Sequence, residues 1–167
     1  ERFKFVNPQE YNVLKIADDE RIDDSSFSEF DRVDYQNAKK IYPTFVFFEK
    51  YLLETSTMPI IISARPQIAE SDIFQFLSLN VEKPNIKQLS NVLYIGCKCG
   101  KPITKYNHII KILKESNIKK ILFFEDSKKN IEYLEENISS VFSYVDLTTC
   151  LIQHSYKTVS LNFRGAL

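Results

Sequence analysis

The stretch ILFFEDSKKN, residues 121–130, places two carboxylates directly after four apolar residues. A short continuous apolar run of this kind is typical of a strand that is covered on both faces. Ser127 follows the acidic pair and is a candidate N-cap for a helix over residues 127–138. Because parallel sheets bind their ligands at the carboxyl ends of strands, Glu125 and Asp126 stand where a functional site is expected.

The same alternation of strand and helix patterns extends over most of the chain. Apolar runs predict strands at residues 58–63, 91–96 and 119–126, with weaker strand candidates at 140–147 and 157–163. Helical periodicity predicts helices at residues 42–54, 66–79, 104–116 and 127–138. This order indicates an α/β fold, a three-layer Rossmann-like parallel sheet with helices on both faces.

Length and composition indicate one globular domain over residues 1–167. The first 36 residues are polar and irregular, as in a cap-like segment, and residues 37–167 form the expected α/β core. An acidic run at residues 18–24 is interpreted as a solvated loop. The 22 basic residues balance the 22 acidic ones, so the net charge favours neither broad nucleic-acid binding nor an anionic membrane. No apolar run approaches the roughly 20 residues of a membrane span.

The three cysteines do not form a recognisable metal site. Cys97 and Cys99 are separated by one residue, and no second pair completes a zinc set with them or with Cys150. We interpret them as reduced thiols, which predicts an intracellular, cytoplasmic protein.

Three kinds of polar residue are expected to meet at the carboxyl edge of the sheet. Ser63 ends the first strand, either Lys101 or Lys105 precedes or opens the helix at 104–116, and Glu125 with Asp126 ends the third strand. A hydroxyl, an ammonium and a carboxylate pair can together hold a phosphoryl group and Mg²⁺. The structural alternative for the acidic pair is a helix cap that interacts favourably with the helix dipole.

The order of these residues resembles the haloacid dehalogenase (HAD) superfamily of phosphohydrolases over residues 58–138. Ser63 is similar to the second family motif, whose hydroxyl binds the phosphoryl oxygen, and Arg65 to an arginine that often follows it. Lys105 fits the third motif better than Lys101, and Glu125 with Asp126 resembles the fourth, which holds Mg²⁺. The resemblance implies a Mg²⁺-dependent phosphatase acting on a phosphate ester, such as a nucleotide or a nucleic-acid end. A structural salt bridge is the alternative role of Arg65.

The N-terminal part extends the resemblance. The segment FVNPQEYNVLKIADDERIDDSSFSEF, residues 5–30, is similar in pattern to a stretch in phage-encoded HAD-like proteins that follows the first motif. This likeness implies that the chain is phage-encoded.

The first family motif, Asp-x-Asp after an apolar strand, does not occur in the chain. In the family its strand is central, between the strands that end here at Ser63 and Glu125, and its first Asp is the nucleophile. Unpaired backbone groups in a core cost about 1–3 kcal/mol each, so another strand is expected there. The candidates are a segment upstream of Glu1, which the non-Met start favours, the segment YNVLKIAD at 11–18 with Asp18 as nucleophile, or a later strand or another chain. Lys15 counts against the second candidate because it would need a polar outlet.

Three functions remain open on the sequence alone. The first is an active phosphatase whose nucleophile lies upstream. The second is a catalytically degenerate HAD-like domain that serves as a structural or interaction subunit and binds a protein partner. The third is an unrelated α/β binding domain.

Overall fold

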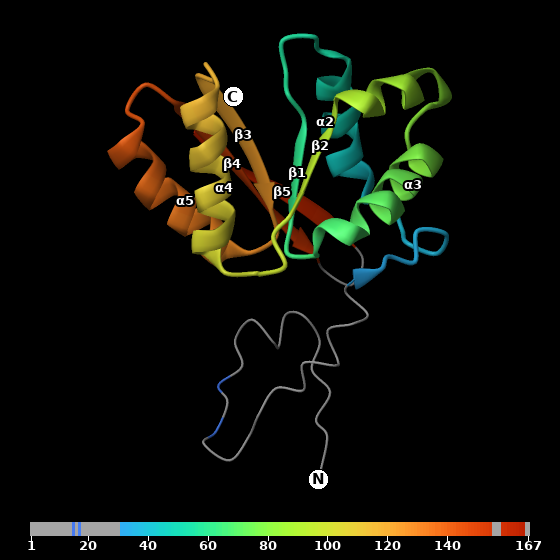
Figure 1. The fold of residues 1–167 in the computed structure, drawn as a ribbon, viewed down its shortest axis with the longest axis horizontal. Coiled ribbons are helices and arrows are strands. Elements are labelled where there is room, and N and C mark those ends of the chain that lie inside the picture. The colour runs from blue at the N-terminus through green and yellow to red at the C-terminus, as the bar shows by residue number, and fades with distance from the viewer. Residues whose placement is uncertain (1–14, 16, 18–30, 155–157, 166–167) are drawn as a thin grey trace.

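The computed structural model describes residues 15, 17, 31–154 and 158–165, which form a mixed α/β fold (Figure 1). Strands and helices alternate through most of this region. In chain order they are α2 (Tyr42–Leu53), β1 (Ile60–Ser63), the 3-10 helix η2 (Gln67–Ala69), α3 (Glu70–Asn80), the 3-10 helix η3 (Lys83–Asn91), β2 (Leu93–Gly96), α4 (Pro102–Glu115), β3 (Lys120–Glu125), α5 (Lys128–Val141), β4 (Asp146–His154) and β5 (Val159–Arg164).

The strands of the described residues form two sheets. In the first, β1 and β2 are parallel, with Ile60 opposite Leu93 and Ser63 opposite Gly96. In the second, β3 is parallel to β4, and β5 is antiparallel to β4. Within the described part of the chain, β1 and β3 each have a strand partner on one edge only.

One apolar cluster joins α2, α3 and η3 to β1. Its buried members include Phe45 and Leu52 of α2 and Leu77 of α3, and Ile61 of β1 packs against them. Phe45 also meets Phe76 of α3 edge to face, with ring centroids 5.8 Å apart. The apolar stripe of α2 thus fixes that helix over β1.

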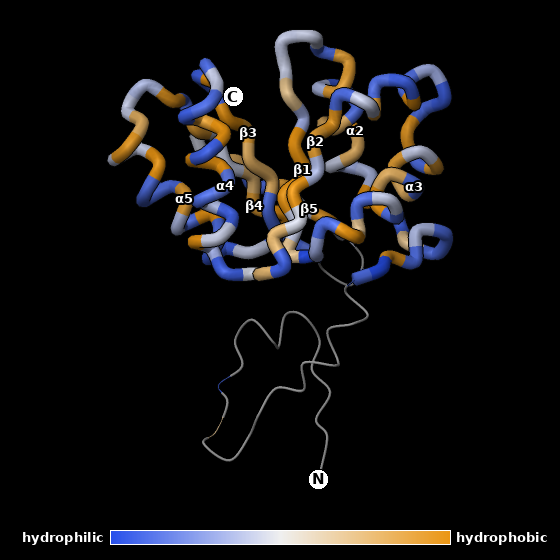
Figure 2. The backbone as a smooth tube through the Cα atoms, in the orientation of Figure 1, coloured by the Kyte–Doolittle hydropathy of each residue, from blue (hydrophilic) through white to orange (hydrophobic). Residues whose placement is uncertain are grey.

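A second cluster joins α4 and α5 to both sheets. Leu113 of α4 and Leu134 of α5 are buried in it, and Ile62 of β1 and Phe123 of β3 pack against it. Successive residues of a strand point to opposite faces. Accordingly Ile61 and Ile62 contact different clusters, and Figure 1 shows α4 and α5 on one side of the strands and α2 and α3 on the other. Figure 2 shows the hydrophobic residues along the strands between these helices.

The expected strand at residues 140–147 is wrong. Helix α5 continues to Val141 because Phe142, one helical turn after Ile138, closes the same cluster and is itself buried. The strand begins later, at Asp146, and its buried centre is polar or small, at Thr148, Thr149 and Cys150. The 3-10 helix η3 is a further element that periodicity did not predict.

Several expectations fall on residues outside the described part. They concern the family-like segment 5–30, the acidic run 18–24 and the strand candidate 11–18. Lys15 and Ala17, which are described, are exposed and lie in irregular backbone. No helix of the described residues is both long and apolar enough to span a bilayer.

Candidate functional site

The carboxyl ends of β1, β2 and β3 lie at one edge of the molecule, the lower edge in Figure 1. The backbone N–H of Cys97, which follows β2, donates to the carbonyl of Ser63 at 2.8 Å. Cys97 also lies close enough to Lys105 for the lysine charge to lower its pKa, although burial outweighs this and raises that pKa overall. Lys105 in turn contacts Glu125. The strand ends are therefore connected through these residues.

Lys105 and Glu125 form an ion pair between α4 and β3. The Lys105 Nζ donates to Glu125 Oε2 at 2.5 Å, and the two side chains are 13% and 7% exposed. Lys105 lies in the first turn of α4, which Pro102 opens, and Glu125 is the last residue of β3. Loop geometry thus brings together two residues that are 20 positions apart in the chain.

Glu125 has donors on both carboxylate oxygens. While Oε2 accepts from Lys105, Oε1 accepts from the backbone N–H groups of Asp126 at 3.1 Å and Ser127 at 3.2 Å. Burial raises the pKa of Glu125, but hydrogen bonds from Asp126, Lys105 and Ser127 and the charge of Lys105 outweigh it. The net effect is a pKa of Glu125 below its ordinary value.

Asp126 is the exposed member of the pair. Partial desolvation of its carboxyl raises its pKa, and the hydrogen bond with Glu125 and the charge of Glu125 raise it further. The pKa values of these two adjacent carboxyl groups are thus displaced in opposite directions, and displaced pKa values are common at functional sites.

Ser63 and Arg65 lie at the end of β1, but Arg65 is directed elsewhere. The Ser63 hydroxyl oxygen accepts from the Arg65 backbone N–H at 3.1 Å, and the hydroxyl of the nearby Tyr94 donates to the Pro66 carbonyl at 3.3 Å. The Arg65 guanidinium donates through Nη1 to the carbonyl of Arg32 at 3.0 Å. Ser63 thus lies at the same edge as Glu125, whereas Arg65 binds the segment ahead of α2.

Lys101 and Lys105 have different surroundings. Lys101 is exposed at the N-cap of α4, where its backbone N–H donates to Cys99 Sγ at 3.4 Å. Thr104 Oγ1 donates to the same sulfur, and these two hydrogen bonds lower the pKa of Cys99. Of the two lysines, Lys105 is the one that the structure brings to the acidic pair.

Asn130 is a polar residue of this region that the sequence did not single out. It lies in the first turn of α5, where the Ser127 hydroxyl accepts its backbone N–H at 3.4 Å. Its side chain is buried, and among the described residues its Oδ1 is the buried side-chain oxygen without a hydrogen-bond partner. The sequence feature that could have indicated Asn130 is its place beside the apolar Ile131, on the buried face of α5.

The residues at this edge fit Mg²⁺ in their donor chemistry. Mg²⁺ takes oxygen ligands, uses one or two carboxylates and keeps water or phosphate oxygens in its remaining positions. Asp126 offers an exposed carboxylate, and Asn130 offers a buried oxygen that lacks a partner. In residues 31–154 and 158–165, no group of three His, Cys, Asp or Glu side chains is placed to bind one metal ion. A Mg²⁺ ion at this edge would therefore also need amide, phosphate or water oxygens as ligands.

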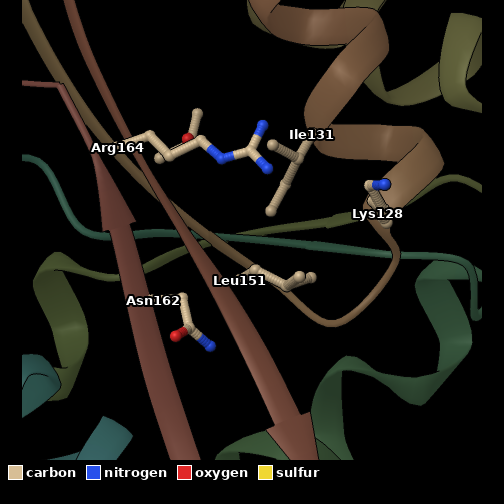
Figure 3. A pocket seen from close by; sticks show the side chains of 6 residues that line it. Lys128, Ile131, Leu151, Asn162 and Arg164 are labelled. Carbon is tan, nitrogen blue, oxygen red and sulfur yellow. The ribbon is translucent and has the colours of Figure 1, made fainter.

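A small pocket lies between α5 and the β4–β5 pair (Figure 3). Lys128 and Ile131 line it from α5, and Leu151, Asn162 and Arg164 line it from the strands. Its volume of about 10 Å³ is roughly the space of one water molecule. None of the predicted site residues lines it, and its size makes it unsuitable for a substrate.

The chain matches no protein-family model, no curated protein and no solved structure. The function of the carboxyl edge therefore rests on its own geometry.

Proposed function

We propose that this chain is the larger part of a HAD-like phosphohydrolase domain, a three-layer Rossmann-like fold that acts on a phosphate ester. The observation that carries the proposal is the Lys105–Glu125 ion pair at the edge where Asp126 and Ser63 also lie. A positive charge, two carboxylates and a hydroxyl at the carboxyl ends of strands suit the binding of a phosphoryl group.

Each residue has a distinct role in this proposal. Lys105 neutralises charge on the phosphoryl oxygens, and Glu125 holds its ammonium in place. The Ser63 hydroxyl, whose oxygen accepts from the Arg65 backbone N–H, donates its proton to a phosphoryl oxygen. Arg65 binds the backbone of Arg32, so its role is to position the segment ahead of α2.

Asp126 would hold Mg²⁺, with Asn130 as a second oxygen donor. When bound, Mg²⁺ would supply positive charge to the phosphoryl group. The chain contains no Asp-x-Asp, so none of its aspartates matches the nucleophile of the family pattern. We assign it to a segment outside the printed sequence, and a nucleotide or a nucleic-acid end is the candidate substrate.

The test is the melting temperature of the chain in MgCl₂ with inorganic phosphate, measured against NaCl of equal ionic strength. A ligand that binds the folded state raises the melting temperature by mass action. We expect the wild type to show this rise and Asp126→Asn to lose it. Asp146→Asn is the matched control because Asp146 is an exposed aspartate at the amino end of β4. An equal rise in wild type and Asp126→Asn, or none in either, would contradict the proposal.

A second candidate is a catalytically degenerate HAD-like domain that serves as an interaction subunit and binds a protein partner. The absence of Asp-x-Asp from the chain favours it. It predicts that neither Mg²⁺ nor phosphate changes the melting temperature, and that the acidic pair serves as the cap of α5.

A further inference from the structure

Cys97 and Cys99 form a pair of free thiols in the loop that leads from β2 to α4. Both residues are half-buried, whereas Cys150, the remaining cysteine of the chain, is fully buried in β4. The loop starts at the carboxyl end of β2, where the backbone N–H of Cys97 donates to the Ser63 carbonyl at 2.8 Å. The roles proposed for the phosphoryl site use neither thiol.

The backbone between the two cysteines turns sharply at Lys98. Among the described residues other than glycine, Lys98 alone has a positive φ, of 52°. Residues held in this left-handed region are concentrated at functional sites. Two contacts fix the turn, because the Lys98 N–H donates to the Arg65 carbonyl at 3.3 Å and Cys97 forms a β-bridge with Pro66.

This turn shortens the distance between the cysteines. Left-handed backbone is the mirror image of an α-helical turn, so the Cα atoms that flank Lys98 are separated by about 5.5 Å from helix dimensions. A disulfide requires a Cα separation of about 4.4–6.8 Å. The loop therefore holds Cys97 and Cys99 at a separation from which they can form a disulfide.

Cys99 has the surroundings of a nucleophilic thiol. Its Sγ accepts hydrogen bonds from Oγ1 of Thr104 and from the backbone N–H of Lys101, both at 3.4 Å. Both donors belong to the start of α4, whose first turn contains no acidic residue. A helix N-terminus favours negative charge and thus the thiolate, and the two hydrogen bonds lower the pKa of Cys99.

Cys97 has surroundings that suit the second thiol of an exchange reaction. Burial raises its pKa, the charge of Lys105 lowers it, and the charge of Cys99 raises it again. At neutral pH the Cys97 thiol is therefore protonated while it lies close enough to Cys99 for their charges to interact. A protonated thiol does not compete for the first attack on a disulfide, but it is placed to attack Cys99 afterwards.

We propose that Cys97 and Cys99 are a redox-active dithiol that exchanges with small soluble disulfides. In the first step the Cys99 thiolate attacks one sulfur of the small disulfide. A mixed disulfide forms as the original S–S bond breaks, and the first small thiolate leaves and takes a proton from water. Cys97 then gives its proton to water and attacks Cys99 Sγ, which expels the second small thiolate. The two protein thiols are thus oxidised to one disulfide, and the small disulfide is reduced to two thiols.

The product is expected to be reversible. A disulfide between residues two positions apart closes a short loop, and a half-buried site leaves it open to attack by small thiols. Disulfides that are strained or exposed are the ones that are readily reduced. This inference rests on the two cysteines and does not depend on the proposed phosphatase activity.

The test uses glutathione disulfide as the probe at pH 7, followed by acid quenching and peptide mapping by mass spectrometry. We expect the wild type to lose two hydrogens at the Cys97–Cys99 peptide and to retain no glutathione. Cys97→Ser should retain one glutathione on Cys99, because the second step is blocked. Cys99→Ser should react at least about tenfold more slowly than Cys97→Ser. Cys150 is the internal control and should remain unmodified.

A second measurement tests the position of Thr104. In the Cys97→Ser background, Thr104→Val removes a donor to the Cys99 thiolate. The pH at which the reaction with glutathione disulfide reaches half its maximal rate should then rise. Thr44→Val is the matched control, since it removes a hydroxyl that donates to the Ile41 carbonyl in α2, on the opposite side of the strands, and should leave this pH unchanged.

Three outcomes would overturn the inference. They are a stable glutathione adduct on the wild type without an internal disulfide, equal reaction rates for Cys97→Ser and Cys99→Ser, and modification of Cys150 ahead of the pair. The wild-type peptide map decides the matter even where a variant fails to fold. None of these readouts involves phosphate or Mg²⁺, so failure here is distinct from failure of the proposed function.

Discussion

Lys105 is held near Glu125 in a largely water-excluded position, and this has a direct consequence for stability. Replacing one partner of a buried ion pair leaves the other charge uncompensated, which costs about 3–5 kcal/mol. We expect Lys105→Met to lower the free energy of unfolding by about 3 kcal/mol, measured by urea denaturation. The exposed Lys101→Met should change it by less than about 0.5 kcal/mol.

The double variant Lys105→Met with Glu125→Gln isolates the interaction itself. Because both charges are removed together, the double variant should lose about 1–3 kcal/mol less than the sum of the two single losses. Additive losses would mean that the two side chains do not interact in solution, and the ion pair would then carry no functional argument.

Replacing Asp126, unlike replacing Lys105, should stabilise the protein at neutral pH, since the folded-state pKa of Asp126 is raised. The folded protein binds the Asp126 proton more tightly than the unfolded chain. This residue therefore adds stability in acid and loses that contribution as the pH rises through its folded-state pKa. We expect Asp126→Asn to melt at a higher temperature than the wild type at pH 7, and the difference to shrink toward about pH 4. Thermal melts over this pH range decide the matter, and a lower melting temperature for Asp126→Asn at pH 7 would contradict the assignment.

Among the secondary-structure elements, the end of β2 is restricted by the chain that crosses it. A Cβ on Gly96 would lie 2.3 Å from both the backbone N of Gln67 and the carbonyl carbon of Pro66. Gln67 also accepts the Gly96 N–H at 2.9 Å through its side chain. We expect Gly96→Ala to cost at least about 1–3 kcal/mol of unfolding free energy, because backbone must move.

Gly100 provides the control for that substitution. Its nearest neighbour for a new Cβ is Ala64 Cβ at 3.9 Å, an ordinary contact. Gly100→Ala should therefore change stability by less than about 1 kcal/mol in urea denaturation. Equal losses for the two variants would show that the close approach at Gly96 does not occur in solution.

The elements that could be predicted from sequence are those with a clean apolar pattern. The strands near Ile61, Tyr94 and Phe123 and helix α4 follow their patterns closely. The pattern fails at the end of α5, where alternating apolar residues resemble a strand although Phe142 extends the helical face. Strand β4 begins later than expected because its buried Thr148 and Thr149 are polar and interrupt the apolar run that is typical of a buried strand.

For the candidate site, the sequence predicts which residues lie at the ends of strands but not which side chains contact one another. Sequence position places Ser63 and Glu125 at the carboxyl edge because parallel strands end together. It cannot say which way a long side chain turns, and Arg65 binds the segment ahead of α2 through a contact 33 residues distant in the chain. Asn130 could not be predicted from the sequence, because an amide in a helix becomes informative only when its hydrogen-bond partners are known.

On the scale of the whole molecule, the candidate site is assembled from both sheets. Glu125, which Lys105 contacts, ends β3 of the three-stranded sheet, and Ser63 ends β1 of the two-stranded sheet. Helices α4 and α5 contact strands of both sheets, because Ile62 of β1 and Phe123 of β3 pack against the same apolar cluster. The relative position of the site residues therefore depends on how these two helices hold the sheets.

The most direct test of the central claim is the affinity of inorganic phosphate, measured by titration calorimetry in the presence of Mg²⁺ for the wild type, Lys105→Met and Lys101→Met. If Lys105 binds the phosphoryl group beside Glu125, phosphate should bind the wild type and Lys101→Met with similar affinity. Lys105→Met should then bind at least about tenfold more weakly, equivalent to about 1.4 kcal/mol. Binding that is unaffected by Lys105→Met, or no binding to the wild type, would contradict a phosphoryl site at this edge.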